Sequence, residues 1–263
     1  MTALLVVAGV LGLAVGSFLN VVIHRVPRHE SLLPPSRCTR CLRRVEPWRN
    51  VPVVSWLLLR GRCAHCRRPI SPSYPLVEAT TALLFVALTA RFGPSPVLPA
   101  YLYLAAVAVA LAVIDLRVRR LPDAIVLPSY LVAALLMVPA GAAGADWWSA
   151  GRGLLAMVAL LTLYLVIALA YPGGMGFGDV KLAGLLGLYL GWLGWSSVWV
   201  GTLTGFVLGG LTGVALLATG RAGRRTAIPF GPFMLAGALL ALFIARPVSS
   251  WYGSLLTVTA RSG

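Results

Sequence analysis

Residues 97–114, VLPAYLYLAAVAVALAVI, form an uncharged apolar run of 18 residues that stops at Asp115. About 20 such residues in a helix cross the hydrocarbon layer of a bilayer. The whole chain shares this character, since 59% of its 263 residues are hydrophobic and only 11% are charged. Soluble globular domains have about 25% charged residues. The composition therefore excludes an ordinary soluble enzyme and a disordered chain, and predicts a polytopic helical membrane protein.

Seven further apolar runs flank this one, so the sequence predicts an all-α bundle of about eight transmembrane helices. The eight runs cover residues 3–23, 74–90, 97–114, 124–141, 151–171, 180–193, 197–218 and 228–245. In the first run the basic residues Arg25 and Arg28 follow the apolar stretch, which is the wrong order for a cleaved signal peptide. We expect this run to remain as a helix with its N-terminus outside.

Lysine and arginine are concentrated in every second connection between the predicted spans. Segments 24–73, 115–123, 172–181 and 219–227 carry 18 of the 22 Lys and Arg residues. Because basic residues are retained on the cytoplasmic side during insertion, these four segments are predicted to be cytoplasmic. The net charge of +15 could instead mark a nucleic-acid-binding protein. Membrane topology already accounts for the charge, so we expect a lipid bilayer and no nucleic acid as partner.

One connection, residues 24–73, is large enough to form a module, and it contains all four cysteines. Cys38 and Cys41 form one C-x2-C pair, and Cys63 and Cys66 form a second pair 21 residues further on. This spacing is typical of structural zinc sites, in which two knuckles supply four thiolates to a tetrahedral ion. Two disulfides or a redox pair are the alternatives. Cytoplasmic thiols are kept reduced, which favours the zinc-knuckle interpretation.

Three of the seven acidic residues, Asp115, Asp123 and Asp179, lie at the ends of predicted spans on the cytoplasmic side, and two of them are candidates for catalysis. Asp115 ends the run 97–114, and Asp179 follows the glycine-rich segment 172–178 and opens the run 180–193. Two carboxylates that share one proton can take a proton from water and polarise a peptide carbonyl. If their helices pack together, Asp115 and Asp179 form the catalytic pair of an aspartic peptidase.

Structural interpretations of these carboxylates remain open from the residues alone. Asp179 could be a helix N-cap, and Asp115 could pair with the arginines that follow it. For Asp123, directly after a proline, the N-cap interpretation is preferred. Glu78 lies just inside the second span, where an ionisable residue is a functional candidate, but the sequence assigns it no role.

Glycines recur every four residues in two of the spans. Gly201, Gly205, Gly209 and Gly213 lie in the seventh span, and Gly12 and Gly16 lie in the first. Glycines at this spacing share one helix face and let a neighbouring backbone approach closely. We interpret both sets as helix-packing surfaces.

Several motifs together resemble those of the type IV prepilin peptidases, which are bifunctional aspartic proteases of the bacterial plasma membrane. The resemblance covers almost the whole chain and includes GSFLNVVIHRVP at 16–27, both C-x2-C pairs, YPLVE at 74–78 and GMGFGDVK at 174–181, which is similar to the family's GxGD signature. It implies that Asp115 and Asp179 are the catalytic pair, and that prepilin or pseudopilin leaders are cut after a glycine at the cytoplasmic face. Many members then methylate the new N-terminus from S-adenosylmethionine.

The expected organisation is a first transmembrane helix (1–23), a cytosolic module with structural Zn²⁺ (24–73) and a transmembrane aspartic peptidase domain (74–263). Methyl transfer rests on the resemblance alone, because no glycine-rich nucleotide loop is visible. A broader intramembrane GxGD protease is one alternative function. A proton-coupled carrier that uses the two aspartates is another. A carrier predicts internal repeats, and the two halves share neither motif nor spacing.

Overall fold

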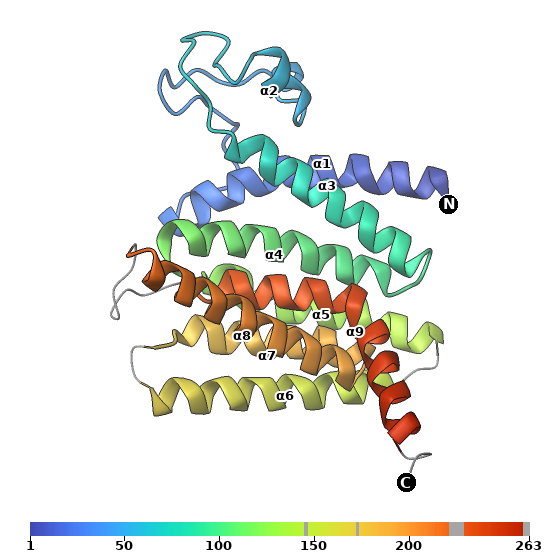
Figure 1. Ribbon diagram of the computed structural model, residues 1–263. Coiled ribbons are helices and arrows are strands. Elements are labelled where there is room, and N and C mark those ends of the chain that lie inside the picture. Colours follow the sequence, from blue (N-terminus) through green and yellow to red (C-terminus); the bar gives the residue numbers. More distant parts are fainter. Residues whose placement is uncertain (145–146, 172–173, 221–228, 260–263) are drawn as a thin grey trace. The chain divides into compact units, whose positions relative to one another are not determined.

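The computed structural model describes residues 1–144, 147–171, 174–220 and 229–259, and within them the chain is helical, as predicted. Eight long helices and one short one, α2, follow each other along the chain (Figure 1). Their bounds are α1 Thr2–Arg25, α2 Val54–Leu58, α3 Ser73–Phe92, α4 Leu98–Val118, α5 Asp123–Gly144, α6 Trp147–Ala170, α7 Phe177–Leu193, α8 Trp195–Ala218 and α9 Gly231–Thr259. Each of the eight predicted runs overlaps one long helix. Residue 228, where the last run was predicted to begin, lies outside the described residues, and α9 continues to Thr259.

Six of the described helices are long and apolar enough to cross a membrane, namely α1, α3, α4, α5, α6 and α8. The other two long helices fall short of that criterion. α7 has 17 residues, about 26 Å of helix, and the apolar part of α9 is Gly231–Ala245. Within the described residues, the expected bundle of about eight helices is confirmed, and six of these helices meet the length and hydropathy of a full span.

The chain divides into two compact units, Met1–Ile114 and Asp115–Gly263. In the first unit, α1 packs against α3 through its glycines. A β-carbon on Gly12 would lie 2.6 Å from Cα of Ala82, and one on Gly16 would lie 2.6 Å from Cα of Glu78. The two backbones are therefore in close contact, which confirms the packing role predicted for Gly12 and Gly16.

In the second unit, the glycines of α8 face α9. A β-carbon on Gly205 would lie 3.3 Å from Cα of Met234, and one on Gly201 would lie 3.3 Å from Cβ of Ala241. Gly209 faces the ring of Phe230 in the same way. The packing surface predicted for α8 is confirmed at these three glycines. It brings α9 against α8 and so fixes the start of α9, where the candidate site lies.

Candidate active site and metal centre

Asp115 is buried three residues before the end of α4, with 5% of its surface exposed. The backbone N–H of Gly231, the first residue of α9, donates a hydrogen bond to its carboxylate. A β-carbon on Gly231 would lie 2.8 Å from Oδ2 of Asp115. The glycine therefore lets the backbone of α9 reach the carboxylate directly.

Asp179 is the third residue of α7, and its carboxylate turns back over the start of the helix. Gly176 is the N-cap, and its N–H donates to Oδ2 of Asp179 at 3.2 Å. Asp179 is thus not the N-cap residue itself, although it does satisfy one backbone donor there. A negative charge in the first turn is also favoured by the helix dipole. Residues 172–173 of the glycine-rich segment lie outside the described residues.

In the second unit, Asp115 and Asp179 lie beside two glycines, Gly231 and Gly178, that contact the same leucine. Leu121, in the connection between α4 and α5, packs between Gly178 and Gly231. Its side chain lies 3.0 Å from the β-carbon position of Gly178 and 3.3 Å from that of Gly231. The end of α4 and the starts of α7 and α9 therefore meet at one end of this unit, with both aspartates there.

Tyr164 of α6 was not singled out in the sequence, where it is one aromatic residue within an apolar run. It is buried, and it lines a small cavity together with residues of α7 that follow Asp179. Its ring stacks on Phe206, with 5.6 Å between the ring centroids. No local pattern could have identified it, because its place in this cavity depends on how α6 packs against α7.

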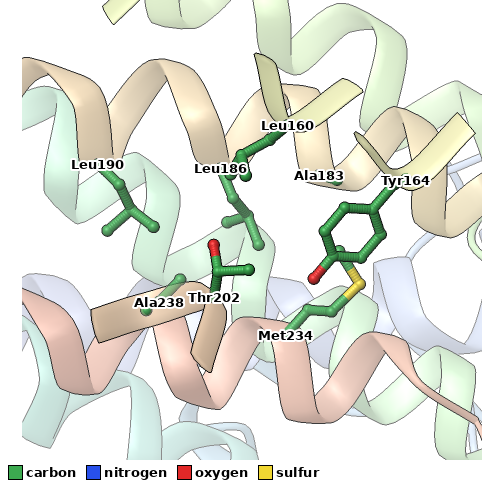
Figure 2. A pocket seen from close by; sticks show the side chains of 9 residues that line it. Leu160, Tyr164, Ala183, Leu186, Leu190, Thr202, Met234 and Ala238 are labelled. Carbon is green, nitrogen blue, oxygen red and sulfur yellow. The ribbon is translucent and has the colours of Figure 1, made fainter. Parts of the chain in front are cut away.

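A small cavity of about 10 Å³ adjoins this tyrosine and is lined by residues of α6, α7, α8 and α9 (Figure 2). Ala183, Leu186 and Leu190 of α7 line it, and they follow Asp179 at helical spacing on one face. Figure 2 shows Tyr164 and Met234 on one side of the space and Leu190 on the other. A cavity of this volume holds about one water molecule at most.

Asp123 does not take the N-cap position that the sequence predicts. The carbonyl of Pro122 accepts the first helical hydrogen bond of α5, from Val126, so Pro122 is the cap and Asp123 lies in the first turn. Both carboxylate oxygens of Asp123 instead accept from Nζ of Lys181 at 2.8 Å. The sequence could not show this pair, because 58 residues separate its members.

The four cysteines converge, as predicted. Their sulfur atoms all lie within 4.8 Å of one another, and the Sγ atoms of Cys38 and Cys66 are 3.9 Å apart. A tetrahedral metal with metal–sulfur bonds of about 2.3 Å requires sulfur atoms about 3.8 Å apart, whereas a disulfide requires about 2.05 Å. Cys38, Cys41, Cys63 and Cys66 are therefore arranged as a donor set for one metal ion.

The two knuckles have the same backbone hydrogen bonds. In each, the N–H of the first cysteine donates at 2.9 Å to the carbonyl five residues later. The residue after the second cysteine, Leu42 or Arg67, has φ of 58° or 54° and donates back to the first cysteine's carbonyl. Hydrogen bonds led by that from the N–H of Cys41 lower the pKa of Cys38 to about 7, against the effect of burial, whereas burial and the other three sulfur atoms raise the pKa of Cys66 to about 11. This geometry directs the four sulfur atoms to a common point.

Glu78 has a definite position that the sequence did not reveal. It is buried on α3, and its Oε2 accepts a hydrogen bond from the N–H of Val53 at 2.7 Å. Asn20 of α1 donates to Oε1 of Glu78 at 3.5 Å and to the carbonyl of Tyr74 at 3.1 Å. Val53 has φ of 61°, a strained value for a β-branched residue. Glu78 therefore joins α1, α3 and the cysteine module.

Comparison with known proteins gives two family profiles that match most of the chain. The Bacterial Peptidase A24 N-terminal domain matches residues 10–92, and the Type IV leader peptidase family matches residues 102–220. A relative from Pseudomonas putida is 38% identical over 89% of this chain and 88% of its own length. The chain belongs to the type IV leader peptidase family. Asp115 and Asp179 both lie within the segment matched by the peptidase profile, and the four cysteines within the other.

Other members of the family are similar over the same extent. A relative from Burkholderia pseudomallei strain 1026b is 36% identical over 90% of this chain and 84% of its own length. One from Pseudomonas aeruginosa is 33% identical over 92% of this chain and 91% of its own length. All three relatives carry the name prepilin leader peptidase/N-methyltransferase. No solved structure matches the chain.

Proposed function

We propose that this chain cleaves the leader peptides of type IV prepilins or pseudopilins, and that Asp115 and Asp179 are its catalytic pair. The observation that carries the proposal is the packing of one leucine, Leu121, against both Gly178, next to Asp179, and Gly231, whose backbone lies against Asp115. Family membership supports the reaction, since the relatives are named for leader cleavage and N-methylation.

The chemistry needs one ionised and one protonated carboxyl group. The ionised aspartate takes a proton from water, and the hydroxide attacks the carbonyl carbon of the scissile peptide bond. The protonated aspartate donates a hydrogen bond to the carbonyl oxygen as negative charge develops there. The C–N bond then breaks, and the leaving amine receives the proton that the first aspartate took from water. Two carboxylates that act on each other electrostatically can share one proton in this way.

The cysteine module is proposed to hold structural zinc through Cys38, Cys41, Cys63 and Cys66. Four sulfur donors close a tetrahedral site and leave no position for a substrate, so the ion would stabilise the fold of the module without acting in peptide cleavage. The spacing of the sulfur atoms supports this donor set.

Methylation of the new N-terminus is proposed as a second activity, because it is part of the name of each relative described above. Its methyl donor would be S-adenosylmethionine. The cavity of about 10 Å³ beside Tyr164 does not fit a molecule of that size, so the second activity is not placed there.

The proposed topology follows the distribution of lysine and arginine. The protein is an integral membrane protein, and we place it in the bacterial plasma membrane with the N-terminus outside and the cysteine module and both aspartates on the cytoplasmic side. The proposed domains are the first helix (1–23), the cytosolic module (24–73) and the membrane peptidase domain (74–263).

Incubation of the detergent-purified chain with a leader-bearing prepilin, followed by intact-mass analysis, tests the proposal. Asp115→Asn and Asp179→Asn are each expected to lower the cleavage rate by about 10⁴-fold, as loss of an essential catalytic group does. Asp123→Asn is the matched control, since it removes the exposed carboxylate paired with Lys181. It is expected to cleave within a few-fold of the parent rate. Full cleavage by either of the first two variants contradicts the site assignment.

A further inference from the structure

The cysteine module carries an exposed apolar surface on α2. Leu57 is 61% exposed and Leu58 is 79% exposed, and Trp48, just before α2, is 69% exposed. Trp56 faces the opposite way, since its indole N–H donates to the carbonyl of Ile70 and its ring packs on Gly61. One side of α2 therefore packs into the interior of the module, and Leu57 and Leu58 remain exposed.

The position of α2 along the membrane helices is fixed by Glu78. α2 begins directly after Val53, whose N–H is bound by Glu78, and Asn20 contacts the same carboxylate. Asn20 and Glu78 each lie five residues from the module end of their helices, which is about 7.5 Å of helix. α1 has 24 residues and is about 36 Å long, whereas the hydrocarbon layer is about 30 Å thick. Asn20 and Glu78 therefore lie close to the edge of the hydrocarbon layer.

Figure 1 agrees with this placement within the first unit, because α2 is drawn beside the first turns of α3. The hydrogen bond between Val53 and Glu78 establishes that the two segments touch. The exposed leucines of α2 therefore lie at the depth where the acyl chains of the lipids meet the headgroups. Apolar side chains at that depth are covered by lipid when the helix lies in the interface.

The charge of the module complements one class of lipid. Between residues 37 and 68 there are nine arginines, all exposed, and a single carboxylate, that of Glu46. Glu46 is already paired with Arg49 at 2.9 Å. A cationic surface with exposed leucine and tryptophan fits an anionic bilayer surface, which supplies both negative headgroups and an apolar layer. A nucleic acid supplies the negative charge but no apolar layer for the leucines.

We propose that the cysteine module docks on the anionic phospholipid surface of the membrane in which α1 and α3 are embedded, with Leu57 and Leu58 inserted at the interface. The arginines contact the phosphate groups, and the Glu78–Val53 hydrogen bond holds α2 at the required depth. The proposal concerns the first unit and does not depend on the catalytic assignment of Asp115 and Asp179.

Hydrogen–deuterium exchange on the full chain in lipid nanodiscs tests the proposal. One set of discs contains phosphatidylcholine alone, and the other adds phosphatidylglycerol. Amides of residues 48–60 are expected to exchange about tenfold more slowly in the anionic discs. The double variant Leu57→Ser/Leu58→Ser should lose that protection, whereas Leu57→Met/Leu58→Met, the matched apolar control, should keep it. Equal zinc content in the two variants shows that the module is intact.

Equal exchange of residues 48–60 in the two kinds of disc overturns the proposal. Protection that persists in the serine variant also overturns it, because lipid would then contact a different surface of the module. Protection by an added oligonucleotide, with none from phosphatidylglycerol, assigns the basic surface to nucleic acid and overturns the lipid assignment as well.

Discussion

A β-carbon on Gly231 would stand 2.8 Å from Oδ2 of Asp115, and the N–H of Gly231 donates to the same carboxylate. Side chains essentially never show so short a contact at Cβ. Any residue larger than glycine at position 231 must therefore displace Asp115 or the first turn of α9. The position of the carboxylate that we propose to be catalytic thus depends on a glycine 116 residues away in the sequence.

Gly231→Ala is expected to lower kcat/KM for leader cleavage by about 100-fold, because displacement of a catalytic group by about 1 Å has an effect of that size. Gly210→Ala is the matched control, since no atom lies within 4 Å of the β-carbon position on that glycine of α8. The control should cleave at the parent rate and gain up to about 1 kcal/mol in stability from the better helix former. A Gly231→Ala protein with parent activity contradicts the close packing at Asp115.

Removal of Glu78 is expected to loosen the junction of α1, α3 and the cysteine module. Glu78→Leu leaves the N–H of Val53 without its acceptor, and burial of an unpaired donor costs about 1–3 kcal/mol. Glu78→Gln retains a carbonyl oxygen that can accept this hydrogen bond, so it should lose less stability than Glu78→Leu. Thermal unfolding in detergent and the exchange rate of the Val53 amide measure the effect.

Thr89→Val on the same helix is the control for Glu78. The Thr89 hydroxyl is buried and has no hydrogen-bond partner within the described part of the chain. Replacing it with a methyl group of similar shape should leave the stability unchanged or raise it slightly. If Glu78→Leu and Thr89→Val unfold at the same temperature, the junction does not depend on the carboxylate.

Much of the architecture could be predicted because the relevant signals are local. Apolar run length located the eight long helices, and paired cysteine spacing located the sulfur cluster. The position of Asp115 and Asp179 at the ends of predicted spans led to the catalytic pair as a hypothesis, and in the structure each lies beside a glycine that contacts Leu121.

The residue roles that the sequence did not reveal depend on contacts with residues that are distant in the sequence. Glu78 finds its donor 25 residues away at Val53, and Tyr164 lines a cavity with residues of α7 only through the packing of α6 on α7. Asp123 was predicted as an N-cap because it follows a proline at a helix start. That prediction was wrong, because Lys181 offers the carboxylate a charged partner that no local rule could supply.

Zinc content should be about one ion per chain when the protein is purified without chelator, as four thiolates in a tetrahedral set require. Cys63→Ser should lose most of the bound metal, because removing one thiolate opens the site. His65→Ala is the control from the same knuckle, since four sulfur donors need no imidazole. Elemental analysis measures the effect, and unchanged zinc in Cys63→Ser would show that the sulfur cluster is not the metal site.

The ion pair between Asp123 and Lys181 is expected to contribute little to stability. Both side chains are substantially exposed, at 55% and 38%, and exposed pairs are worth about 0.2–1 kcal/mol. A double-mutant cycle with Asp123→Asn and Lys181→Met should therefore give a coupling free energy below about 1 kcal/mol. A coupling several times larger would mean that the pair is shielded from water in the membrane-bound protein.

Arg152 of α6 holds the far end of α7, opposite Asp179. Its Nε donates to the carbonyl of Gly191 and its Nη2 to that of Trp192, both at 2.7 Å. The last carbonyls of a helix have no partner within the helix, and a positive charge there is favoured by the helix dipole. Arg152→Met is expected to cost about 1.5–3 kcal/mol, the value of a hydrogen bond to a charged group.

Arg152→Lys is the informative comparison, because lysine keeps the charge but cannot present two fixed donors to two carbonyls. It should restore part of the stability lost in Arg152→Met. Cleavage measured well below the unfolding temperature should stay close to the parent rate in both variants, since the start of α7 with Asp179 is held separately by Gly176. A large loss of cleavage at low temperature in a fully folded Arg152→Met protein would instead show that the far end of α7 controls the position of the aspartate.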